Sequence, residues 1–86
     1  MTVAGKMTLE TAAALLAQGK TEFGPGETLE VDLAAVQEVD SSGLAVLFAW
    51  QRAAQTGGSS LRIHNSPRNL ISLAEVYGVS GLLPLA

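Results

Sequence analysis

Short strand patterns and longer helix patterns alternate along this chain, and this alternation limits the possible folds more than any other feature. The strand patterns lie at residues 2–4, 28–33 and 61–64, and the second alternates apolar with acidic side chains. Helix patterns follow each of them, and a turn containing glycine and proline is expected at residues 23–26. Strands and helices at this spacing predict an α/β domain, a small sheet with helices packed against it.

Each expected helix has start and stop signals in the sequence. These signals are, in chain order, Thr8 and Gly19, residues 42 and 55 with Gly57 and Gly58 beyond, and Ser66 with Pro67 before Gly78. The third helix is expected to bury one stripe, Leu70, Leu73, Ala74 and Tyr77, with the Tyr77 hydroxyl at the rim of the core. The apolar tail, residues 79–86, is expected to lie against the body of the domain.

Length and composition bound what the chain can be. Its 86 residues are enough for one small domain, residues 1–86. Apolar residues make up 48% and charged residues 15%, so the fold is expected to be compact and to leave apolar side chains outside for a partner. The net charge of -3, with five scattered basic residues, gives no footprint for nucleic acid or an anionic membrane.

Cysteine usage and hydropathy set the expected compartment. The chain has no cysteine, so a disulfide, a thiolate nucleophile and a zinc–thiolate cluster are all excluded. Its longest apolar run, residues 44–50, is too short to span a bilayer, and no basic segment followed by an apolar stretch opens the chain. We therefore expect a cytoplasmic protein without direct membrane insertion.

The junction before the second helix is the segment in which function is expected. Asp40, Ser41, Ser42 and Gly43 lead directly into an apolar helix. Either serine can cap that helix, accept a phosphate or meet a partner, and a phosphate would add about -1.5 to -2 charges and switch docking off. The alternative is that both serines are only turn and capping residues, with Asp40 helping to hold the turn.

The second helix carries more apolar side chains than one buried face needs. One arc can face the sheet: Val46, Leu47, Ala49, Trp50, Ala53 and Ala54. Leu44 and Phe48 would then form an exposed ridge beside the serines, ready for a groove on another protein. In the alternative rotation they are core residues and Trp50 lies outside. Either rotation is expected to leave a large side chain exposed.

Other patterns carry less chemistry. His64 could be imagined in a hydrolytic triad with Asp40 and a serine, but no nucleophile elbow surrounds Ser41 or Ser42. The acidic residues lack metal-ligand spacing, and the glycines at residues 24 and 26 lack the lysine and helix of a phosphate-binding loop. We therefore expect no catalytic residue, no cofactor and no metal.

The chain resembles the STAS domain family over nearly its whole length. The residues that carry the resemblance are Ala4, Gly5, Leu15, Leu16, Val31, Asp32, Leu33 and residues 39–47 and 70–83. The central motif is Val-Asp-Ser-Ser-Gly-Leu-Ala, at residues 39–45. Its continuation to Leu47 and the run at residues 73–84 are most similar to the MlaB branch, the STAS subunits of Mla phospholipid transporters.

The resemblance implies a binding role. A STAS subunit of that branch has no catalysis of its own and binds the cytoplasmic ATPase of an ABC transporter, supporting its assembly and activity. Such a subunit is peripheral to the inner membrane through its partner. Together with the helix pattern, the resemblance implies partner contacts from Asp40, Ser41, Ser42, Gly43, Leu44 and Phe48.

A second STAS branch gives the alternative function. Anti-sigma-factor antagonists are phosphorylated by a kinase-type anti-sigma factor, on a serine that corresponds to Ser42. The functional threonine of the MlaB branch corresponds instead to Ser41. Because this chain has both serines, the motif leaves both branches open.

The chain departs from the family at its N-terminus. A STAS domain opens with a hairpin of two strands, whereas this sequence begins at what corresponds to the second one. Either the first strand is missing or the true start lies upstream. A missing strand would leave a bare sheet edge that can pair with another chain, so an edge-strand homodimer is a further expectation.

Overall fold

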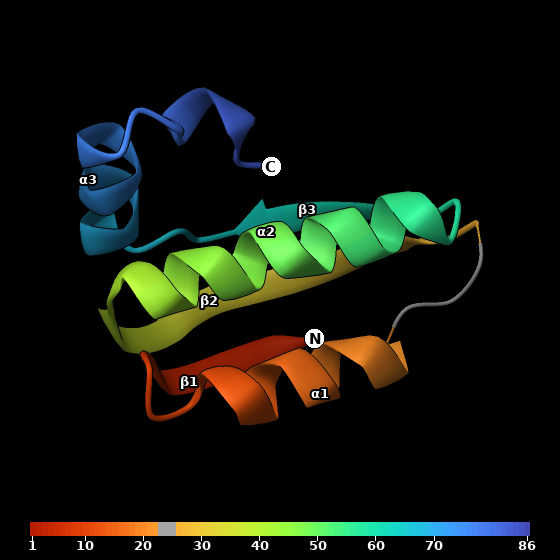
Figure 1. Cartoon of the computed structure of the whole chain (residues 1–86), viewed down its shortest axis with the longest axis horizontal. Helices are drawn as coiled ribbons and strands as arrows, with labels where there is room; N and C mark the ends of the chain where they lie inside the picture. Colours follow the sequence, from red (N-terminus) through yellow and green to blue (C-terminus); the bar gives the residue numbers. More distant parts are fainter. Residues whose placement is uncertain (23–25) are drawn as a thin grey trace.

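The computed structural model describes residues 1–22 and 26–86 and has the predicted alternation of strands and helices (Figure 1). The strands are β1 (Thr2–Met7), β2 (Thr28–Val39) and β3 (Ser60–His64). The helices are α1 (Ala12–Glu22), α2 (Ser41–Thr56) and α3 (Arg68–Val76), followed by the short 3-10 helix η1 (Ser80–Leu82). The α/β fold is confirmed, while the turn predicted at residues 23–26 falls, except for Gly26, outside the described residues.

The three strands form one parallel sheet in the order β1-β2-β3, so β2 is central. α1 connects β1 to β2, α2 connects β2 to β3, and the two helices pack side by side on one face of the sheet (Figure 1). α3 lies near the start of α2, and η1, which contacts α3, leads the chain back toward β3 (Figure 1). The sheet therefore has one face covered by helices and one open face.

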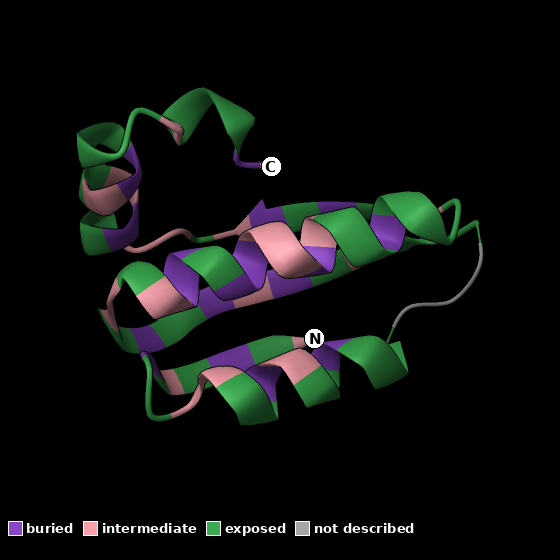
Figure 2. Cartoon of the chain, in the orientation of Figure 1, coloured by how far each residue is buried: buried purple, intermediate pink, exposed green. Residues whose placement is uncertain are grey.

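The core lies between the sheet and the helices, where the buried positions of Figure 2 face one another. Its largest fully buried side chains are Trp50, Met7, Leu33, Leu47, Ile63, Leu70, Val31 and Val46. The Trp50 indole N–H donates a hydrogen bond to the Leu15 carbonyl, 3.2 Å away, so this large side chain is also satisfied as a polar group. Trp50 thereby joins α2 to α1.

β2 continues six residues past the predicted end of its strand pattern because it is bulged. Its register against β1 shifts between Thr2 and Ala4 and again between Gly5 and Lys6. Each shift places one extra β2 residue in the ladder, which reverses the in–out alternation beyond it. The inward residues are therefore unevenly spaced: Val31, Leu33, Val36 and, half-buried, Val39.

The predicted limits of the first helix are wrong at both ends. Thr8 belongs to a turn, in which its N–H donates to the Thr11 hydroxyl and its carbonyl accepts from the Thr11 N–H, both at 3.0 Å. α1 therefore begins only at Ala12. Gly19 lies inside α1 and does not end it. The residue has to be a glycine because a Cβ at that position would collide with the Trp50 indole. The glycine provides space for a close helix contact rather than a stop.

The third helix also differs from its prediction. Pro67 is its N-cap and makes no side-chain capping bond, so the predicted Ser66 cap is wrong. Leu70 and Ala74 are buried as expected. Tyr77 follows the last helical residue and is 57% exposed, so its predicted place in the core is wrong.

The open face of the sheet is polar and pairs its own side chains across neighbouring strands. The pairs, with their distances, are Thr28 with Ser60 (3.0 Å), Glu30 with His64 (3.0 Å) and Arg62 (3.9 Å), and Lys6 with Glu38 (3.8 Å). Parallel sheets are normally covered on both faces. Here these cross-strand pairs give the uncovered face a surface suited to water.

The C-terminal tail lies against the body, as predicted. Leu83 is buried, and the Ala86 N–H donates to the Ile63 carbonyl at 2.8 Å, which extends the sheet beside β3. β1 forms the opposite edge of the sheet. Among the strands of the described residues, it pairs only with β2. The edge-strand homodimer stays a prediction.

The helices seen in residues 1–22 and 26–86 include none with the length and apolar character needed to cross a membrane.

Candidate functional site

The junction between β2 and α2 lies where the parallel strands end and the next helix begins. β1 ends at Met7 and β2 at Val39, so the turns that follow them meet at one edge of the sheet. The carboxyl edge of an open α/β sheet is the usual place for a functional site. The four junction residues of the motif, of which Ser41 is exposed and Gly43 is buried, are therefore held by regular elements on both sides.

Asp40, rather than a serine, caps α2. Its Oδ1 accepts hydrogen bonds from the N–H groups of Ser42 (2.8 Å) and Gly43 (3.2 Å). Its Oδ2 accepts from the Leu9 N–H at 3.1 Å, which ties the β1–α1 turn to the start of α2. The capping role predicted for the serines is wrong, and the part assigned to Asp40 in holding the turn is confirmed.

The same bonds set the ionisation of Asp40. Desolvation by burial raises the pKa of this carboxyl, but the backbone N–H donors together lower it more, so its pKa lies below the ordinary value. Asp40 is therefore a fixed anion at neutral pH whose acceptor capacity is used within the domain. It positions the junction and is a poor candidate for a proton-transfer group.

The two serine side chains belong to different surface depressions. Ser41 is exposed and lines an apolar depression with Leu44 and Phe48. Ser42 is half-buried and lines the crease between α1 and α2, with Leu16 among its neighbours. Since Asp40 caps the helix, neither hydroxyl is needed for the cap, and Ser41 is the more accessible of the two.

Gly43 lies beneath this surface. It is buried, and a Cβ at this position would collide with the carbonyl oxygen of Met7. The absence of a side chain lets the first turn of α2 sit directly on the end of β1. Its role in the structure is to set how closely the junction approaches the sheet.

Both predicted rotations of the second helix are partly wrong. Trp50 is only 1% exposed and Leu44 only 5%, so both are core residues. Phe48 is half-buried and remains at the surface. α2 can bury both sides of itself because α1 covers Trp50 while α3 and the tail approach Leu44, an arrangement that a single-helix pattern does not contain.

The depression beside Ser41, which we call the Phe48 groove, has an almost wholly apolar lining and a volume of about 290 Å³. Its residues are Ser41, Leu44, Ala45, Phe48, Tyr77 and Val79. Three of these, Ala45, Tyr77 and Val79, are absent from the partner contacts predicted from the sequence. The exposed Tyr77 forms part of this wall. Only the packing of the α3 end against α2 brings it there.

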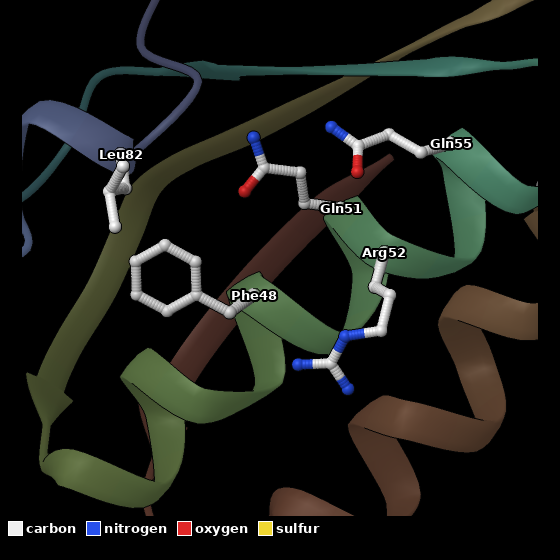
Figure 3. Close-up of a pocket in the computed structure, with 5 residues that line it drawn as sticks. All are labelled: Phe48, Gln51, Arg52, Gln55 and Leu82. Carbon is white, nitrogen blue, oxygen red and sulfur yellow. The ribbon is translucent and has the colours of Figure 1, made fainter.

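Beyond Phe48 the surface of α2 becomes polar. Figure 3 shows the Phe48 ring between the Leu82 side chain and the following turns of α2, which carry Gln51, Arg52 and Gln55. Phe48 therefore marks the boundary between an apolar and a polar stretch of the same helix.

Two further depressions flank the junction. One is acidic and is lined by Lys6, Thr8, Leu9, Glu10, Glu38 and Asp40. The other runs along α3 and is lined by Val39, Arg68, Asn69, Ser72, Leu73 and Val76. Four surface depressions thus meet at the junction, because each of four consecutive residues lines a different one: Val39, Asp40, Ser41 and Ser42.

The residues of the imagined hydrolytic triad are engaged elsewhere. His64 Nε2 lies 3.0 Å from Glu30 Oε1 on the open face of the sheet, whereas Asp40 bonds to backbone N–H groups. The residues of the imagined triad are therefore not brought together. No group of three histidine, aspartate or glutamate side chains that could hold a metal ion occurs among the described residues.

Comparison with known proteins agrees with this architecture. The family model described as "Mlab, STAS domain" matches residues 1–84. The crystal structure of a sulfate transporter family protein from Wolinella succinogenes shares the fold, with a TM-score of 0.77 and 17% sequence identity over 99% of this chain and 72% of that one. No curated protein gives a significant match. Because the family model covers almost the whole chain, the protein belongs to the STAS family of the MlaB type.

Proposed function

We propose that this domain is a non-catalytic accessory subunit that binds the cytoplasmic ATPase of a phospholipid-transporting, Mla-type ABC complex and supports its assembly and activity. The observation that carries the proposal is the Phe48 groove, an apolar depression beside the exposed Ser41 hydroxyl. Membership of the MlaB-type family supports the choice of partner. In this role the domain is held at the inner membrane by its partner and makes no lipid contact of its own.

The physical argument begins with the apolar surface that the fold leaves uncovered. Phe48 and Tyr77 are aromatic side chains at the mouth of a groove, and aromatic side chains supply much of the binding free energy of protein interfaces. The groove is held in place by α2, whose start is fixed by Asp40 and by the close contact of Gly43 with β1. A preformed apolar groove costs little ordering on association.

The test is the affinity of the purified chain for a purified Mla-type ATPase subunit, measured by titration calorimetry. We expect Phe48→Ala to weaken binding by about tenfold or more, because an anchor of the groove is removed. Ser41→Glu is expected to weaken it as well, since a charge would have to be desolvated at the rim of an apolar groove. Thermal melting checks that both variants fold.

Two variants on the open face of the sheet serve as matched controls. Ser60→Glu introduces the same charge as Ser41→Glu, and Arg62→Ala truncates a side chain of similar reach to Phe48. Both controls should bind like the wild type. If Phe48→Ala and Ser41→Glu also bind like the controls, the interface has been placed on the wrong surface.

The alternative is an anti-sigma-factor antagonist regulated by phosphorylation, which the presence of Ser42 beside Ser41 leaves open. The half-buried position of Ser42 argues against it, since a kinase needs access to the hydroxyl. Incubation with a kinase-type anti-sigma factor and ATP, followed by intact-mass measurement, separates the two. Stoichiometric phosphate on Ser42, with no affinity for the ATPase, would establish the alternative.

A further inference from the structure

Charge is distributed unevenly around the Phe48 groove. On one side lies the acidic depression, in which Glu10, Glu38 and Asp40 face a single cation, Lys6. Lys6 is 3.8 Å from Glu38, and Asp40 is bonded by backbone N–H groups. Glu10 has no ion pair with any residue of the described ranges, 1–22 and 26–86. The depression therefore keeps a negative charge that the domain does not balance.

The acidic depression also holds a hydroxyl without a partner. Thr8 lines it, is only 8% exposed, and its Oγ1 makes no hydrogen bond within the described part of the chain. Buried polar atoms are almost always paired, since leaving one unpaired costs free energy. A cation arriving from outside, such as an ammonium or guanidinium group, would meet the carboxylates, whereas the Thr8 hydroxyl oxygen itself is buried.

In the depression along α3 the unbalanced charge is positive. Arg68 is the first residue of α3, the end of a helix at which the macrodipole disfavours a cation. It has no ion pair with the rest of the described chain. Glu38 and Val39 border the two flanking depressions and are neighbours on a strand, so they point to opposite sides of it. The two charges therefore flank the end of β2.

Each of these two depressions adjoins the groove through neighbouring residues of the chain. Asp40 of the acidic depression precedes Ser41 of the groove, and Val76 of the Arg68 depression precedes Tyr77 of the groove. We infer that the docking surface is polarised, and that it binds a segment of the ATPase with an apolar side chain flanked by a basic and an acidic one. The basic side chain enters the acidic depression, and the carboxylate pairs with Arg68.

This inference rests on the proposed docking function and adds the direction in which the ATPase segment lies in the groove. An apolar groove alone accepts a segment in either direction, whereas unlike charges in the two depressions that adjoin it favour one direction. Like charges brought together by the reversed direction would oppose association. The charges thus select both the partner segment and its direction.

The experiment compares charge-reversal variants of the full chain in binding to a purified Mla-type ATPase subunit. Glu10→Lys and Arg68→Glu are each expected to weaken binding about three- to tenfold at low salt, mainly through slower association, and less at high salt. Glu22→Lys and Lys20→Glu, in the last turn of α1, make the same charge changes away from the junction and should have no such effect.

The possible results separate this inference from the function on which it rests. If both reversals match their controls while Phe48→Ala still weakens binding, the orientation is wrong and the docking site stands. If Phe48→Ala also has no effect, the proposed function is wrong as well. If the chain alone self-associates and the reversals abolish that association, the occupant is a second copy of the chain, and the inference is overturned.

Discussion

The open face of the sheet and the β2–α2 junction are both exposed, yet their side chains are satisfied in different ways. On the open face, Glu30 lies against His64 and Arg62, so the charges are paired within the domain. At the junction, the Phe48 groove has an almost wholly apolar lining, and Glu10 in the adjoining acidic depression makes no ion pair within the described residues. A surface that completes its own pairs suits water, whereas one that leaves its chemistry incomplete suits a partner.

The largest expected effect is a loss of stability, and it distinguishes a core residue of α2 from a groove residue of the same helix. Trp50→Ala should destabilise the domain by about 3–5 kcal/mol, because it empties the contact between α1 and α2 and removes the bond to Leu15. Phe48→Ala, on the half-buried surface, should cost clearly less. Urea unfolding followed by circular dichroism measures both. Equal losses would place Phe48 in the core and remove the contrast.

The next effect tests how closely the junction sits on the sheet. Gly43→Ala should destabilise the fold by about 1–3 kcal/mol, since its Cβ would collide with the Met7 carbonyl. Gly81→Ala is the matched control, because a Cβ there meets nothing within 4 Å. Similar unfolding midpoints for the two variants would show that the first turn of α2 can move away from β1.

Loss of the Asp40 cap should have a smaller effect that depends on pH. Its pKa is lowered in the folded state, so the cap contributes fully above the ordinary carboxyl pKa, and that contribution is lost as pH falls through the lowered value. Asp40→Ala should therefore be less stable than the wild type at neutral pH, with the gap closing in acid. Urea midpoints at a series of pH values measure this gap. A gap that stays constant would contradict the role of the charged cap.

The smallest effect is expected on the open face. Arg62→Ala should change stability by about 0.5 kcal/mol or less, because its contact with Glu30 is exposed and long at 3.9 Å. Thermal melting at low and high salt would detect a larger contribution. A loss comparable with that of Gly43→Ala would mean that the open face is structurally as demanding as the junction.

The sequence predicts the α/β order well because strand and helix periods differ, and α2 was placed to within a residue. The end of β2 was missed because two bulges break the alternation on which the prediction depends. The local pattern predicts a helix stop at Gly19, whereas its role is a close contact with Trp50, a residue far away in the chain. Local patterns cannot contain such contacts.

The sequence predicts only part of the candidate site, because the rest depends on contacts between residues far apart in the chain. Ser41, Leu44 and Phe48 come from one helix, so their neighbourhood follows from helix geometry. Tyr77 and Val79 form the other wall only because α3 ends beside α2, which depends on tertiary packing. The sequence predicts a serine cap for α2, whereas Asp40 is the cap. This difference depends on the backbone geometry at the junction.

The hydrogen bond from the Leu9 N–H to Asp40 has one more consequence. It links the turn before α1 to the first residues of α2, although the Leu9 side chain lies outside the Phe48 groove. A shift of the α2 start on complex formation would alter that bond and with it the magnetic environment of the Leu9 amide. In a titration followed by NMR, this amide is therefore a built-in reporter of events at a surface it does not touch.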